Sequence, residues 1–125
     1  MKAAAVIHPG TLLAPLILEP CGLSQSVLAR QLGFNQPQPV NELIKGKRGI
    51  TPKMALLLER LTGGEYPAEF WLLAQMRWDL QQAKQNLPPA RLAIVERIPP
   101  EGDALEAAQQ AGFGDLLEAS AQLRA

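Results

Sequence analysis

Amide and basic side chains gather between residues 25 and 48 of this chain. The amides of Gln and Asn can form paired hydrogen bonds with adenine, whereas Lys and Arg can contact guanine or the phosphate backbone. One such residue alone is usually no more than solvated surface, but their order along this stretch favours a DNA-contacting surface. The candidate DNA-binding residues are Gln25, Gln36, Gln38, Asn41, Lys45, Lys47 and Arg48.

Two short helices joined by a tight turn would position these side chains. Ser24 can cap the first helix, whose apolar residues recur at helical spacing. Gly33 can adopt the positive φ at which that helix must end. Asn35 can cap a second helix, Pro37 is tolerated in its first turn, and Gly46 suits its C-terminal end. This order predicts a helix-turn-helix, in which the second helix enters the major groove of DNA.

Further helices are predicted on both sides of this motif. An apolar run over residues 11–18, which Thr11 can cap and Pro20 ends, predicts a first helix. Thr51, followed by proline, begins another, and residues 67–85 form a longer one. The sequence therefore predicts an all-α domain of five helices.

The helix over residues 67–85 carries more apolar surface than one side of a small domain can bury. One apolar face holds Phe70, Leu73, Leu80 and Ala83. A second face holds Trp71, Ala74 and Trp78. Either the helix is buried within its own subunit, or the second face forms the interface of a homodimer, where aromatic anchors are favoured. We take Trp71, Ala74 and Trp78 as the candidate dimer interface.

A proline-rich break after residue 85 separates this domain from a C-terminal extension, residues 86–125. Residues 92–98 contain Ile and Val and could form a short strand. Asp103 and Asp115 each precede a helical pattern and are predicted to begin two short helices.

Charge is distributed unevenly, although the formal net charge is zero. Residues 1–85, the predicted DNA-binding and dimerisation domain, hold nine Lys or Arg and six Asp or Glu, whereas residues 86–125 hold three and six. The basic excess therefore lies with the helix-turn-helix. The acidic extension is expected to face a basic partner, to fold back on its own dimer, or both.

Composition excludes several other classes of protein. The 47% hydrophobic content over 125 residues supports one compact core with an appendage. No apolar run reaches the ~18 residues of a membrane-spanning helix, so the cytoplasm is the expected location. Cys21 cannot form an internal disulfide and is predicted to be a small buried hydrophobe. With one histidine, His8, and no metal-ligand cluster, phosphate-binding loop or nucleophile motif, we expect neither an enzyme nor a metal or cofactor site.

Three ordered stretches resemble the HigA-type antitoxins, a branch of the Xre-like, λ-repressor-like helix-turn-helix regulators. They are residues 8–25, which open with His-Pro-Gly, residues 41–51 and residues 67–72. The resemblance covers about residues 7–85. It implies a dimeric repressor that binds a palindromic operator and neutralises a toxin, commonly an mRNA interferase with a RelE-like (HigB-like) fold.

Two prolines depart from the family pattern. Pro37 and Pro39 stand where family members tend to carry polar or basic residues, and the stretch from Gly33 to Val40 is one residue longer. Pro39 has no backbone N–H, so either the recognition helix begins later or base reading is weak. Two alternatives therefore stand beside a DNA-binding antitoxin: an interaction-only antitoxin without specific DNA binding, and a stand-alone phage-type repressor.

Overall fold

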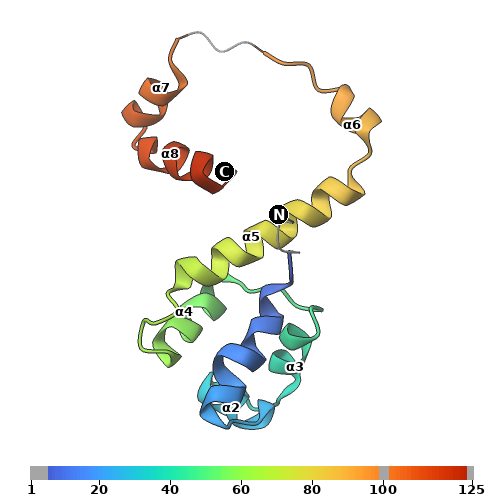
Figure 1. Ribbon diagram of the computed structural model, residues 1–125, viewed down its shortest axis with the longest axis vertical. Helices are drawn as coiled ribbons and strands as arrows, with labels where there is room; N and C mark the ends of the chain where they lie inside the picture. Colours follow the sequence, from blue (N-terminus) through green and yellow to red (C-terminus); the bar gives the residue numbers. More distant parts are fainter. Residues whose placement is uncertain (1–5, 99–101, 124–125) are drawn as a thin grey trace, which may run out of the picture. The chain divides into compact units, whose positions relative to one another are not determined.

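The computed structural model describes residues 6–98 and 102–123 (Figure 1). Every regular element in these residues is helical, which confirms the predicted all-α class. The strand predicted over residues 92–98 is wrong, because helix α6 covers Pro89–Ala93 and the following residues have no regular structure. A proline suits the first turn of a helix, and the β-branched residues beyond it have no adjacent strand in the described residues to pack against.

The chain forms two compact units, Met1–Pro88 and Pro89–Ala125. The first unit contains the N-terminal helix and the helices α2 to α5. The second contains α6, α7 and α8. The boundary lies slightly after the expected one, because α5 continues to Asn86.

The N-terminal helix changes geometry along its length. It consists of a 3₁₀ turn η1 (Pro9–Leu12), a π turn η2 (Ala14–Leu18) and an α-helical turn α1 (Glu19–Cys21). His8 caps it instead of Thr11, and Gly22, at φ 63°, ends it instead of Pro20. In a regular α-helix the Pro20 ring would crowd the carbonyl four residues earlier, and that carbonyl lies in the π turn.

No single helix in the described ranges is long and apolar enough to cross a membrane. Among the helices of residues 6–98 and 102–123, one bent pair reaches that length and composition: the N-terminal helix taken together with α2, to which it is bent by 95°. Several apolar side chains of this pair, including Leu13, Ile17 and Leu28, belong to the core of the first unit.

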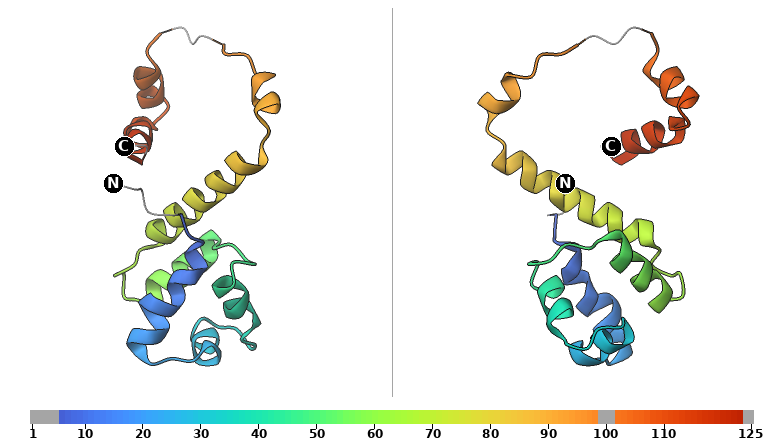
Figure 2. Two further views of the ribbon diagram at one scale, coloured as in Figure 1. Left: turned by 45° about the vertical axis from the view of Figure 1, so that its right-hand side comes forward. Right: turned by 180° about the vertical axis from the view of Figure 1, so that it is seen from behind.

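Each helix of the first unit places a fully buried side chain in one core. The remaining helices of this unit are α2 (Gln25–Gln31), α3 (Gln38–Ile44), α4 (Pro52–Leu61) and α5 (Ala68–Asn86). The side chains with no exposed surface include Leu13, Leu28, Leu43, Leu58 and Trp71. Burying one such side chain contributes about 1.5–3 kcal/mol. Figures 1 and 2 show α4 beside the first half of α5, whose second half projects from the domain.

The aromatic face of α5 points into the subunit. Trp71 is fully buried, and its indole Nε1 donates to the Tyr66 carbonyl at 3.2 Å. The prediction that Trp71 contacts a second subunit is therefore wrong. Ala74 is half-buried, and Trp78 is half-buried with its ring 5.4 Å from that of His8. The larger aromatic side chains gain more from burial than leucines do, which favours this face for the core.

The opposite apolar face of α5 is exposed instead, except at Phe70, which is half-buried and packs against the core. Leu73, Met76 and Leu80 are 43%, 36% and 50% exposed. This apolar stripe, Leu73–Met76–Leu80, borders a shallow groove of about 510 Å³. The groove is lined by Ile50, Leu72, Gln75, Met76, Asp79, Leu80 and Ala83.

The segment from His8 to Gly10 joins the C-terminal end of α3 to α5. A Cβ atom on Gly10 would overlap the Leu43 carbonyl of α3, so no side chain fits there. His8 Nδ1 accepts a hydrogen bond from the Gly10 N–H at 3.0 Å, and the Thr11 hydroxyl donates to the His8 carbonyl at 2.6 Å. The His8 ring meets Trp78 edge-on. One short segment thus connects two distant helices.

The second unit contains a helical hairpin of α7 (Ala104–Gln110) and α8 (Gly114–Leu123). Asp103 caps α7 as predicted, because its carboxylate accepts from the Leu105 N–H at 2.8 Å. Asp115, in contrast, lies in the first turn of α8, which begins one residue earlier. The turn between the helices passes through Gly112 at φ 86°.

Gly10→Ala is expected to destabilise the first unit, because the added methyl group overlaps the Leu43 carbonyl. Overpacking of this kind costs about 1–3 kcal/mol, which urea denaturation would measure. Gly49→Ala adds the same methyl group beside the end of the Gln75 side chain, 3.3 Å away, and should cost less because this contact is longer and involves a side chain rather than the backbone. An equal loss in both variants would contradict the close-approach argument.

Acid is expected to weaken the fold through His8. Burial lowers the pKa of His8 from its ordinary value of 6.5, and Asp79 opposes this shift. The unfolded chain therefore binds the proton more readily, so stability is complete above ~pH 6.5 and falls as the pH drops through the lowered pKa. Urea midpoints between ~pH 7.5 and ~pH 5 would measure this loss. His8→Asn, which can still cap the helix but does not titrate, should lose less; an identical pH profile would contradict the prediction.

Candidate nucleic-acid interface

The predicted helix-turn-helix is present as α2, a turn and α3, which lie side by side (Figures 1 and 2). Ser24 caps α2 as predicted, its hydroxyl accepting the Val27 N–H at 3.2 Å. Gly33 ends the helix with φ 93°. Phe34 packs against the core, and its N–H donates to the Ala29 carbonyl at 2.8 Å. Local sequence signals therefore determine the turn.

The recognition helix α3 begins later than the sequence predicted. Pro37 occupies the capping position instead of Asn35, and no side chain caps the helix. Pro39 is its second residue, where a missing N–H costs no helical hydrogen bond. The prolines thus leave α3 intact. Gln36 lies exposed in the turn, whereas Gln38 is exposed as the first residue of α3.

Two of the predicted DNA contacts bind one another. The Asn41 side-chain nitrogen Nδ2, on α3, donates to Gln25 Oε1, at the start of α2, over 3.1 Å. Both residues are half-buried. The bond uses one of the two N–H groups of Asn41, so the other N–H and the side-chain oxygen remain available. Gln25 therefore orients Asn41 before any ligand arrives.

Glu42, which the sequence analysis did not identify, organises the outer surface of α3. Arg48 donates to one Glu42 carboxylate oxygen through both Nε and Nη2, each at 3.2 Å. A hydrogen bond from the Gln38 side chain lowers the pKa of the Glu42 carboxyl most, and Arg48 lowers this pKa further. Glu42 therefore engages two predicted contact residues. Its six-residue separation from Arg48 crosses the end of α3, so helical pairing at i+3 or i+4 could not reveal it.

The other basic residues surround the C-terminal end of α3. Gly46 follows the helix at φ 74°, and the Lys47 N–H donates to the Glu42 carbonyl at 2.8 Å, a common helix ending that confirms the predicted role of Gly46. Lys45, Lys47 and Arg48 are exposed there. Cations are favourable beside the carbonyl end of a helix. The structure thus brings the predicted basic cluster together.

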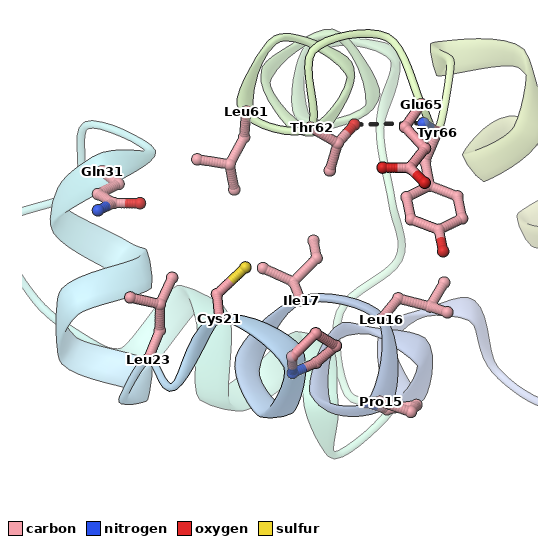
Figure 3. A pocket seen from close by; sticks show the side chains of 11 residues that line it. Pro15, Leu16, Ile17, Cys21, Leu23, Gln31, Leu61, Thr62, Glu65 and Tyr66 are labelled. Carbon is pink, nitrogen blue, oxygen red and sulfur yellow. Dashed lines mark hydrogen bonds between the residues drawn. The ribbon is translucent and has the colours of Figure 1, made fainter.

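A separate groove of about 600 Å³ lies between the N-terminal helix, α2 and the end of α4 (Figure 3). Cys21 lines it and is exposed, which corrects the prediction of a buried cysteine. On the α4 side the Thr62 hydroxyl accepts the Tyr66 N–H at 3.3 Å. Among the residues that the structure describes, none of those predicted to contact DNA lines this groove. Within residues 6–98 and 102–123, no three His, Cys, Asp or Glu side chains are grouped to hold a metal ion.

No family model matches this chain. The chain is 42% identical to virulence-associated protein I of Dichelobacter nodosus over 88 residues. This matched stretch covers 70% of this chain and 79% of that relative. It resembles the solved antitoxin GraA at 31% identity and a TM-score of 0.67, covering 77% of this chain and all of GraA. It also resembles Pseudomonas aeruginosa antitoxin HigA, solved with higBA promoter DNA, at 30% identity and a TM-score of 0.62, covering 78% of this chain and all of HigA.

These similarities agree with the geometry of the helix-turn-helix. Both solved relatives are antitoxins rather than enzymes. Each is matched over its entire length, and about a quarter of this chain has no counterpart in either. The chain is at least 30% identical to each of these three relatives, and the match covers more than two thirds of each. The chain therefore belongs to the HigA family of DNA-binding antitoxins.

Proposed function

We propose that a homodimer of this chain binds a palindromic operator in its own promoter and neutralises an RNA-cleaving, RelE-like (HigB-like) toxin in the cytoplasm. The DNA-binding part of this proposal rests on one observation: on the helix-turn-helix, the Gln25 side chain orients that of Asn41 through a hydrogen bond. The HigA relative solved with promoter DNA supports it. The toxin is assigned from the antitoxin relatives.

Asn41 is the proposed base-reading residue. With α3 in the major groove, its free N–H and side-chain oxygen can pair with N7 and N6 of adenine while Gln25 holds the other N–H. Gln38 is a second candidate, because the N-terminal residues of a recognition helix contact base edges. Gln36, in the preceding turn, would reach only the edge of the groove.

Phosphate binding is assigned to Lys45, Lys47 and Arg48, with the Gln25 nitrogen as an additional donor. Each neutralised phosphate should contribute about −0.9 to the slope of log affinity against log salt. Arg48 would exchange its Glu42 partner for a phosphate or share it. These contacts would set register, whereas Asn41 would set sequence preference.

The Leu73–Met76–Leu80 stripe is the proposed dimer interface, where it would pack against a second copy of the chain. This assignment replaces the aromatic face predicted from the sequence, since Trp71 is enclosed and Trp78 packs on His8. A two-fold dimer would present two recognition helices about 34 Å apart, one turn of the duplex. That spacing matches a palindromic site.

Asn41→Ala is expected to weaken binding to a promoter fragment by about 1–3 kcal/mol and to relax one base preference. Because Gln25 orients Asn41, part of the Gln25→Ala loss should disappear in the Asn41→Ala background, and the part that remains would report the phosphate contact of the Gln25 nitrogen. A mobility-shift assay on the upstream promoter measures all three variants.

Gln31→Ala is the matched control, since this exposed glutamine of α2 lines the separate groove of Figure 3. It should bind the promoter like the wild type. Unchanged affinity and preference in Asn41→Ala would remove it as a base-reading residue. A wild-type chain that binds toxin but no promoter DNA would instead establish an interaction-only antitoxin.

Leu80→Glu is expected to yield monomers in sedimentation, because it places a charge in the apolar stripe that a second copy would bury. Leu56→Glu makes the same change at an exposed leucine of α4, outside the stripe, and should remain dimeric. A wild-type monomer at micromolar concentration, or a dimeric Leu80→Glu protein, would contradict this interface.

A further inference from the structure

We infer that the hairpin of α7 and α8 is a docking module for a basic protein surface, and that its partner is the toxin. The inference rests on the proposed function for the identity of the partner. It rests on the hairpin itself for the chemistry of the contact.

The hairpin exposes a contiguous apolar cluster. Phe113, Leu116 and Leu117 are 58%, 58% and 42% exposed. Leu105 and Leu123 are only half-buried, so the interior of the hairpin is small. Two short helices cannot enclose these side chains, and contiguous exposed apolar residues mark interaction surfaces.

The same hairpin is uniformly acidic. Residues 102–123 contain four carboxylates and neither Lys nor Arg. The carboxylates are those of Asp103, Glu106, Asp115 and Glu118. Acidic groups around an apolar cluster fit a partner surface that places basic groups around an apolar patch.

This chemistry disfavours two other occupants. A second hairpin would bring two equally acidic surfaces together, which costs free energy. The chain's own DNA-contacting surface is basic, but its exposed residues are polar amides and cations, with no apolar patch to receive Phe113 or Leu116. A basic protein satisfies both the charge and the apolar cluster. An RNA-cleaving toxin is such a protein, because it must bind the phosphates of its substrate.

The hairpin is preformed, which reduces the cost of binding. Asp103 caps α7, and the Phe113 N–H donates to the Ala108 carbonyl at 2.7 Å across the turn. Gly114 starts α8 so close to Gln109 that a Cβ atom would lie 2.5 Å from its side chain. The backbone that carries the apolar and acidic groups is therefore arranged before the partner arrives.

The test uses the full chain and, as the probe, the small basic protein encoded by the reading frame next to this gene. Isothermal titration measures its affinity for the wild type, for Phe113→Ser with Leu116→Ser, and for Asp115→Lys with Glu118→Lys. Each pair should raise Kd at least about tenfold, the equivalent of 1.4 kcal/mol. Added salt should weaken the wild-type complex more than the charge-reversed one. Circular dichroism checks that helix content is retained, and the exposed charge-reversed pair keeps the test valid if the serine pair unfolds.

Glu65→Lys with Glu69→Lys is the matched control, because it reverses two exposed carboxylates of the first unit. It should leave the toxin affinity near that of the wild type. A loss equal to that of the hairpin variants would mean a general charge effect and would overturn the inference.

The remaining outcomes separate the inference from the proposed function. If the wild type does not bind the neighbouring gene product, or no such gene exists, the toxin part of the proposed function is wrong. If the wild type binds and the hairpin variants bind equally well, only the inference is wrong. Stronger promoter binding by the charge-reversed pair, with unchanged toxin affinity, would show that the hairpin covers its own DNA-contacting surface and would also overturn the inference.

Discussion

The position of the recognition helix depends on the contact between Gly10 and the Leu43 carbonyl. A helix of seven residues is too short to be stable in isolation, and α3 has no side-chain cap. Tertiary contacts must therefore hold it, through Val40 and Leu43 in the core and through the Gly10 backbone at its carbonyl end. Because His8 fixes Gly10 and also packs on Trp78, the orientation of α3 is linked to that of α5.

The outer surface of the helix-turn-helix combines side chains that are hydrogen-bonded to one another with exposed lysines. The Gln25–Asn41 and Glu42–Arg48 contacts hold their groups in place before binding, which lowers the entropy lost when they meet a ligand. Lys45 and Lys47 are exposed at the end of α3, as suits long-range attraction to phosphates. In the proposed function, the ordered amides supply base preference and the lysines supply most of the salt-dependent affinity.

The zero net charge of the chain follows from two units with opposite tendencies. DNA attracts a basic surface, whereas an RNA-binding toxin attracts an acidic one. In the proposed function the two kinds of charge would lie on separate parts of the chain, since the basic excess is in the first unit and the hairpin of the second is acidic. The solved antitoxins are matched over their whole length, whereas about a quarter of this chain has no counterpart in either of them.

The sequence by itself determined the local elements of this protein. Ser24 as a cap, and Gly33 and Gly46 as helix endings, act on backbone groups within a few residues, so their effect can be predicted without knowing the rest of the fold. Only the tertiary structure decided which apolar face of α5 is buried, because both faces satisfy the helical period. It likewise paired Glu42 with Arg48 across a turn and left residues 94–98 without a strand, since such outcomes depend on which distant elements lie nearby.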